Sequence, residues 1–264
     1  MNLLKGLALG ILSFLLVLSL SVFGVAFLVK QTILNPGFVS SELNKLDVPQ
    51  LAEEFLSEQI PEEMLTDEVL SDIITDLEPW IQEQVTDGVY TFYEYLTGES
   101  ESLSVVVSLE PVKESLRDYV SETTLQSIPS TFELNEASLS PQLSANIELV
   151  REYIGYFQVG YIFLIGFMLL LIVGIVAIDH QVRSATRRLG TIFLPEGVLL
   201  LVGFFIARYF AERQILPLGV IPYLEEWLPQ LVSDFVAPLL MLSIGLIIGG
   251  VVLLTISFVY KRQA

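Results

Sequence analysis

Three long runs of apolar residues divide the chain, at 6–29, 153–178 and 237–260, and none of them contains Asp, Glu, Lys or Arg. A helix needs about 20 predominantly apolar residues to cross the hydrocarbon core of a bilayer. A fourth, less regular run has eleven uncharged residues between Glu196 and Arg208. The pattern therefore predicts four transmembrane helices, at residues 1–30, 153–178, 191–213 and 236–260.

The first apolar run resembles a secretory signal in position, and two interpretations of it are open. Its apolar length exceeds the roughly 7–15 residues of a cleaved signal, and no A-x-A site follows it. An uncleaved signal anchor is therefore the favoured prediction for residues 1–30.

Between the first two spans, residues 31–152 have the patterns of a folded domain. Apolar residues recur at helical spacing through Val69, Ile73, Leu77, Ile81 and Val85, which is typical of a helix that packs on a core. Pro79 either kinks one long helix or begins a second one. We predict two helices, 66–77 and 79–96, ended by Gly98, with a shorter amphipathic segment at 48–59.

After Gly98 the periodicity changes. Residues 102–110 are short and β-branched and predict a strand, and 131–134 is a candidate partner strand. Pro111 begins a short helix between them. From Pro141 the helical pattern continues without a breaker into the second span, which predicts one helix of about 38 residues.

The predicted fold class is a mainly α membrane protein. Four transmembrane helices carry a small α+β or mostly helical extracytoplasmic domain, inserted between helices 1 and 2. The remaining segments are a cytoplasmic basic loop at 179–190, an extracytoplasmic amphipathic connection at 214–235 and a cytoplasmic tail at 261–264. We expect the connection to form a helix that lies on the outer membrane face or packs under the acidic domain.

Positive charge predicts the orientation of these segments. Lys5, the three arginines of the 179–190 loop, and Lys261 with Arg262 all fall on one side of a four-span topology. Since short cytoplasmic loops are enriched in Lys and Arg, both termini are predicted to be cytoplasmic. The chain has no cysteine and no N-x-S/T acceptor, and it fits a bacterial or archaeal plasma membrane.

Negative charge is concentrated in residues 31–152, which contain 25 acidic and four basic residues. Three interpretations are open: a solvated surface that keeps the domain soluble, a divalent-cation site, or a docking surface for a basic partner. The densest acidic cluster, and so the candidate calcium or magnesium site, is Asp67, Glu68, Asp72 and Asp76. Nucleic acid is a poor partner for such a surface.

The sequence contains few of the residues and motifs that indicate an enzyme. The only histidine is His180, on the predicted cytoplasmic side, so an extracytoplasmic Ser-His-Asp triad is not available. No phosphate-binding glycine motif occurs either. We predict a protein that is not an enzyme and that needs no cofactor beyond a possible divalent cation.

Ionisable residues in the third span are the other candidates for function. Arg208 and Glu212 lie one turn apart, and Glu196 lies further toward the cytoplasmic side. Charges within a membrane usually face protein or water, so these residues are either conduit residues or an anchor at the helix end. The patterns Gly6–Gly10 and Gly245–Gly249 favour tight helix packing or self-association.

These patterns favour a binding, sensing or assembly component of the cell surface, in contact with lipid and with protein partners or a second copy. The alternative is a small channel or transporter subunit that uses Arg208, Glu212 and Glu196.

Overall fold

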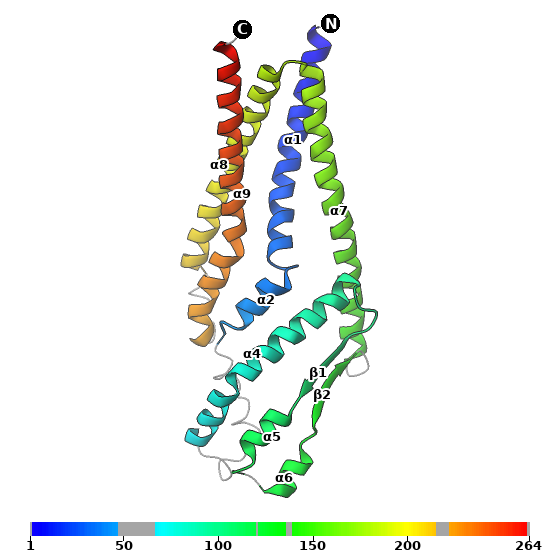
Figure 1. Cartoon of the computed structure of the whole chain (residues 1–264), viewed down its shortest axis with the longest axis vertical. Coiled ribbons are helices and arrows are strands. Elements are labelled where there is room, and N and C mark those ends of the chain that lie inside the picture. The colour runs from blue at the N-terminus through cyan, green and yellow to red at the C-terminus, as the bar shows by residue number, and fades with distance from the viewer. Residues whose placement is uncertain (1, 47–66, 120, 136–138, 215–221, 263–264) are drawn as a thin grey trace. The chain divides into compact units, whose positions relative to one another are not determined.

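The computed structural model describes residues 2–46, 67–119, 121–135, 139–214 and 222–262 (Figure 1). The chain is mainly helical and divides into two compact units. Unit one contains Met1–Thr32 and Phe157–Ala264, and unit two contains Ile33–Tyr156. The predicted segment 48–59 lies outside the described residues.

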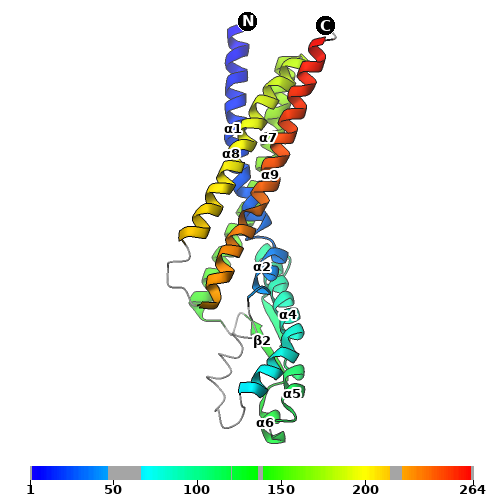
Figure 2. The ribbon, with the colours of Figure 1, turned by 90° about the vertical axis from the view of Figure 1, so that its left-hand side faces the viewer.

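Unit one is formed by four long helices: α1 (Asn2–Gln31), the C-terminal part of α7 (Pro141–Asp179), α8 (Val182–Gln214) and α9 (Pro222–Arg262). Each is long and apolar enough to cross a membrane, which confirms the prediction of a multi-pass membrane protein. The N-terminus of α1, the turn between α7 and α8, and the C-terminus of α9 lie at the same end of this unit (Figures 1 and 2).

Two connections differ from their predictions. The segment 179–190 is not a loop, because α8 begins at Val182 and the turn before it is only two residues long. His180 makes this turn possible with a left-handed backbone (φ 51°), and its N–H donates to the carbonyl of Val176. The second difference is that residues 222–235 form no separate amphipathic helix, since α9 continues through them and through Pro229 and Pro238.

Helices α8 and α9 are antiparallel neighbours with a very close contact (Figures 1 and 2). A methyl group added at Gly197 would lie 2.9 Å from the carbonyl oxygen of Ser243. One added at Gly190 would lie 2.9 Å from the carbonyl oxygen of Gly250. Two turns beyond Gly250 on α9, the hydroxyl of Ser257 donates to the carbonyl of Arg183 on α8 at 3.0 Å. Small residues at seven-residue intervals on both helices therefore allow the two backbones to touch.

The glycine patterns singled out in the sequence do not make this contact. A methyl group added at Gly6, Gly10 or Gly245 would meet nothing within 4 Å, and one at Gly249 would meet only Phe193, at 3.9 Å. The prediction of tight helix packing was thus right for α9, but the glycines that provide it are different ones.

Helix α1 joins the other helices of unit one through an apolar core. Its buried Leu16 packs in one cluster with residues of α7 and α8. The fully or nearly buried members of this cluster are Leu9, Leu16, Leu20, Met168, Leu171, Ile175, Leu189 and Ile192.

Unit two is built on α4 (Asp67–Thr97), which is one continuous helix. The prediction of two helices separated at Pro79 was therefore wrong. Leu77 on one side of the proline and Ile81 on the other pack in the same cluster with Leu116 of α5 (Glu110–Leu116), so burial on both sides favours continuation. Gly98 ends α4 with φ 82°, as expected for a helix C-cap.

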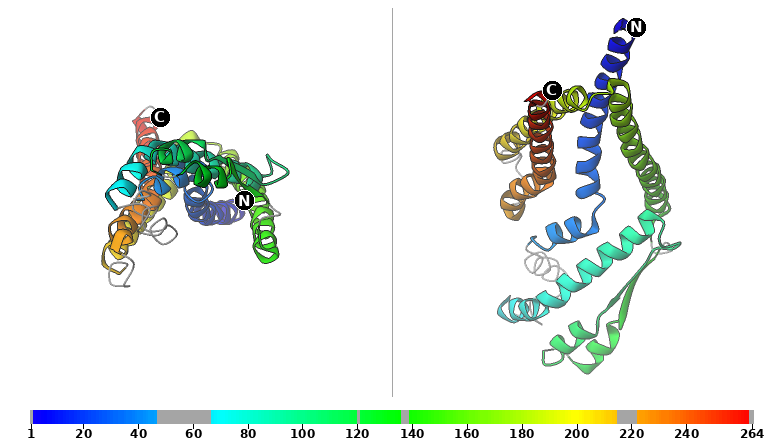
Figure 3. Two further views of the ribbon diagram at one scale, coloured as in Figure 1. Left: turned by 90° about the horizontal axis from the view of Figure 1, so that it is seen from below. Right: turned by 45° about the horizontal axis from the view of Figure 1, so that its top comes forward.

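A two-stranded antiparallel sheet follows, formed by β1 (Ser104–Ser108) and β2 (Thr131–Asn135), and both strands were predicted. The pairing places Val106 opposite Glu133. In the sequence, α5 and α6 (Glu122–Ser127) connect the two strands. The sheet runs beside α4, as the right-hand view of Figure 3 shows.

The second core of unit two lies where α4, β1 and the first part of α7 meet. Its buried members are Tyr95, Leu96, Leu103 and Ile154, and Phe92 packs against them. The short helix α2 (Pro36–Leu43) contacts α4, and the side-chain amide of Asn44 donates to Thr86 at 3.1 Å. Two aromatic residues of α4, Tyr95 and Phe92, are therefore packing residues of this core.

Candidate functional site

Glu196 is the most unusual ionisable residue of unit one. It lies at the midpoint of the candidate membrane span of α8, Val182–Phe210, and its side chain is only 3% exposed. Its carboxylate oxygen Oε1 lies 2.7 Å from the hydroxyl of Ser21 on α1. The sequence identified Glu196 as a candidate, but the partner 175 residues away carried no signal of its own.

No described basic side chain lies near Glu196 along the helices that surround it. On α8 the nearest are Arg188 and Arg208, about 12 and 18 Å away along the axis. On α1, Lys30 is nine residues beyond Ser21, which is about 13 Å. Within the described ranges, Glu196 makes no ion pair.

Ser21 has two acceptors within reach. Its hydroxyl lies 2.7 Å from Glu196 Oε1 and 3.2 Å from the carbonyl oxygen of Val17, one turn earlier on α1. A serine hydroxyl has one proton to donate and can also accept. It can therefore donate to either acceptor while it stays in contact with Glu196.

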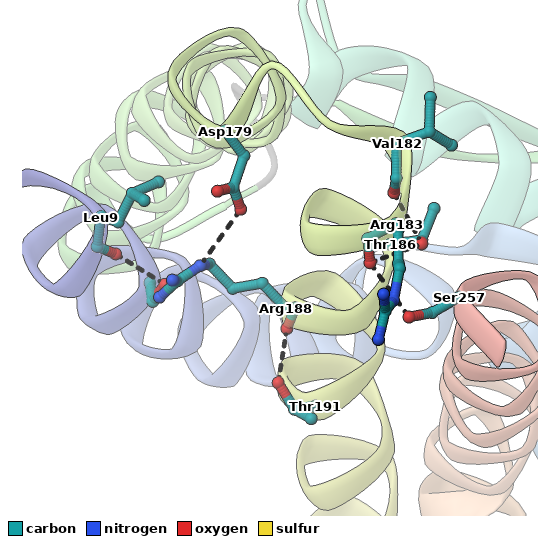
Figure 4. A network of polar contacts seen from close by, with 9 residues as sticks. Leu9, Asp179, Val182, Arg183, Thr186, Arg188, Thr191 and Ser257 are labelled. Atoms are coloured by element: carbon teal, nitrogen blue, oxygen red, sulfur yellow. Dashed lines mark hydrogen bonds and ion pairs between the residues drawn. The ribbon is translucent and has the colours of Figure 1, made fainter. Parts of the chain in front are cut away.

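A second buried carboxylate lies at the turn between α7 and α8. Asp179 is 7% exposed, and its Oδ2 lies 3.5 Å from Nε of Arg188 (Figure 4). Figure 4 shows the Arg188 side chain extending from α8 toward the end of α7. Neither of these two atoms has a hydrogen-bond partner among the described residues, so the attraction is that of an ion pair. Arg188 was predicted to lie in the basic loop, and nothing in the sequence pattern indicated its pairing with Asp179.

Of the predicted pair Arg208 and Glu212, the structure describes the side chain of Arg208 alone. Arg208 is exposed on α8, and the side chain of Glu212 lies outside the described residues. The structure therefore brings Glu196 together with Ser21 and does not join it to Arg208, which lies more than three turns further along the same helix.

The predicted cation cluster is likewise described in part. Asp72 and Asp76 are exposed on α4, and the side chains of Asp67 and Glu68 lie outside the described residues. Among the residues that the structure does describe, no group of three His, Asp or Glu side chains is arranged to hold a metal ion.

The surface of unit two is strongly acidic. Outward-facing carboxylates occur on α4, α5, α6, β2 and the start of α7, and also in the connections after α4 and α5. The exposed acidic residues are Asp72, Asp76, Glu83, Asp87, Glu94, Glu99, Glu101, Glu110, Glu114, Asp118, Glu122, Glu133, Glu148 and Glu152. This surface is far from neutral, and it favours positively charged molecules.

Three of the four basic residues of unit two have partners within the unit. Lys45 pairs with Glu42 at 2.6 Å, and Lys113 donates to the hydroxyl of Ser130 at 3.1 Å. Arg151 lies 4.7 Å from the centre of the Tyr95 ring and donates to the carbonyl of Ser100. These contacts leave the outer surface with little positive charge of its own.

Arg151 also lines an open cavity of about 650 Å³, between the end of α4 and the first turns of α7. Two carboxylates, Glu148 and Glu152, and the backbone at Gly98 line the same cavity. The Arg151 guanidinium is already engaged by Tyr95 and Ser100, so the cavity offers no free cation.

The hydroxyl of Tyr93 connects α4 to the start of unit two by donating to the carbonyl of Ile33. Burial raises the pKa of Tyr93 above its usual value, because the charged phenolate is disfavoured away from water. On α7, the hydroxyl of Tyr156 donates to the carboxylate of Glu152 at 2.7 Å.

No protein-family model, no curated protein and no solved structure matches this chain.

Proposed function

We propose that this chain is a membrane protein that presents an acidic domain outside the cytoplasm and binds positively charged partners with it. One observation carries the proposal. The described carboxylates of unit two lie almost entirely on its surface, while Lys45, Lys113 and Arg151 are held by internal contacts. Such a surface attracts cationic molecules and speeds their association.

The proposed orientation follows from the distribution of basic residues. Lys5, Arg183, Arg187 and Arg188 belong to the end of unit one at which the N-terminus, the turn before α8 and the C-terminus meet. If this end is cytoplasmic, as the positive-inside rule favours, then residues 33–156 follow one crossing and precede the next, outside the cytoplasm. A bacterial or archaeal plasma membrane is the proposed location.

The role is a binding, sensing or assembly role and not catalysis. A domain whose acidic residues are dispersed over its surface recognises charge and not a single small substrate. Metal ions are not required for this role, and a protein partner with a basic surface is the proposed ligand class.

The test measures binding of a lysine-rich peptide to the full chain in nanodiscs at two ionic strengths. Wild type is expected to bind, and the affinity is expected to fall as salt is added, because exposed charges are screened. The variant Asp72→Asn/Asp76→Asn/Glu83→Gln/Asp87→Asn should bind more weakly. The matched control, Asp72→Glu/Asp76→Glu/Glu83→Asp/Asp87→Glu, keeps the charge and should bind like wild type.

Two results would refute the proposal. One is a wild-type affinity for the peptide that does not depend on salt. The other is equal binding by the neutralised and the charge-conserving variants, which would show that the surface charge serves solubility alone.

A further inference from the structure

A carboxylate in the middle of a membrane-spanning helix needs compensation for its charge. Glu196 is 3% exposed and lies at the midpoint of the candidate membrane span of α8, Val182–Phe210. Moving an unpaired charge out of water is costly, and the charge is normally paired, solvated or neutralised. A single hydroxyl, that of Ser21, is the only side-chain partner that the described residues provide.

The helices around Glu196 offer no cation for this purpose. Besides Glu196, the charged residues of α8 whose side chains the structure describes are Arg183, Arg187, Arg188 and Arg208, all at least two turns away from Glu196. On α1 they are Lys5 and Lys30, and the charged side chain of α9 between 227 and 259 is Asp234. On α7, Asp179 lies at the end of the helix and is paired with Arg188. Among the described residues, none of them forms an ion pair with Glu196.

We propose that Glu196 is a proton-binding site in the middle of the helical bundle, with Ser21 as its hydrogen-bond partner whether or not the proton is bound. This site goes beyond the proposed role of the acidic domain and does not depend on it.

The geometry accounts for both states. When the proton is bound, the carboxyl O–H of Glu196 donates to Ser21, and the Ser21 hydroxyl donates to the carbonyl of Val17, 3.2 Å away. When the proton is lost to water, the Ser21 hydroxyl rotates and donates to the Glu196 carboxylate across the same 2.7 Å. The carboxyl loses one proton, the hydroxyl keeps its own, and the contact between α1 and α8 remains.

The first test is infrared spectroscopy of the full chain in nanodiscs at neutral pH. The difference spectrum between wild type and Glu196→Gln should contain the carbonyl stretch of a protonated carboxylic acid, which shifts in heavy water. The control is Asp179→Asn, which removes the ion-paired carboxylate and should remove no such band. Absence of the band from the Glu196→Gln difference would overturn the proposal.

The second test needs no variant and therefore does not depend on the folding of one. Dicyclohexylcarbodiimide enters lipid and adds to protonated carboxyl groups, and mass spectrometry locates the adduct in wild type. Glu196 should be labelled, less so as the pH is raised, and Asp179 should not. Labelling of Asp179 without Glu196 would overturn the proposal. Protection of Glu196 by sodium at constant pH would assign Na⁺ as the ligand and also overturn it.

Discussion

A single methyl group at Gly197 tests the contact between α8 and α9. In the Gly197→Ala variant, the new Cβ would lie 2.8 Å from Cγ1 of Ile247, 2.9 Å from the Ile247 nitrogen and 2.9 Å from the carbonyl oxygen of Ser243. Favourable contacts between non-bonded heavy atoms lie near 3.5–4.0 Å, roughly 0.6 Å or more beyond these distances. Two of the three atoms belong to the backbone, so no side-chain rotation relieves the overlap and the helices must separate.

The magnitude follows from two opposing effects. Overpacking of a tight interior typically costs about 1–3 kcal/mol. Replacing glycine by alanine within a helix gains about 1 kcal/mol of helix propensity. The variant is therefore expected to lose up to about 2 kcal/mol in the free energy of unfolding.

Two matched controls isolate the contact from the propensity. Gly203 on α8 and Gly245 on α9 have nothing within 4 Å of an added methyl group. The Gly203→Ala and Gly245→Ala variants should therefore be neutral or slightly more stable than wild type. The assay is reversible unfolding in mixed detergent micelles, followed by circular dichroism. If Gly197→Ala is as stable as the two controls, the close approach of α8 and α9 is wrong.

Three further predictions concern charged and titratable groups. Arg188→Gln leaves Asp179 buried without its cation and should destabilise the protein by about 1–3 kcal/mol. In a double-mutant cycle, adding Asp179→Asn should restore most of the lost stability, and an additive loss would contradict the ion pair. Burial raises the pKa of Tyr93, so the neutral side chain stabilises the fold below a pH of about 10, and this stabilisation is lost as the pH rises through the pKa of the folded state. At alkaline pH, the thermal unfolding of Tyr93→Phe should therefore depend less on pH than that of wild type. Millimolar calcium should stabilise the full chain no more than sodium chloride of equal ionic strength, and a specific rise that Asp72→Asn/Asp76→Asn removes would instead indicate a cation site.

The local patterns of the sequence predicted the elements well where one segment decides its own structure. The apolar runs predicted the four long helices, Gly98 predicted the end of α4, and the β-branched run predicted β1. The long helix from Pro141 was also predicted, because nothing in its sequence interrupts the helical pattern.

The failures occur where a distant segment decides the outcome. Pro79 did not break α4, because packing of residues on both sides of it against α5 outweighs the missing backbone hydrogen bond. The close packing of α8 on α9 depends on Gly190 and Gly197 meeting particular residues of another helix, and no local glycine motif contains that information.

At the candidate site too, the sequence predicted what depends on local residues and not what depends on contacts with distant segments. Glu196 was identifiable as a charge within an apolar run, since that is a property of the local sequence. Its burial and its contact with Ser21 depend on how α1 packs beside α8, and serines are common in such helices. The pairing of Asp179 with Arg188 depends on a two-residue turn that was predicted as a longer loop.

The central claim is the sidedness of the chain in the membrane, with residues 33–156 outside the cytoplasm and the basic helix ends inside it. The chain is well suited to test this claim because it contains no cysteine. Two exposed positions serve as reporters, Asp118 in unit two and Gln181 in the turn between α7 and α8. Each is changed to cysteine, and intact cells are treated with a maleimide that does not cross membranes. The account predicts that Asp118→Cys is labelled on intact cells and Gln181→Cys only after permeabilisation. Labelling of Gln181→Cys on intact cells, with Asp118→Cys protected, would contradict it.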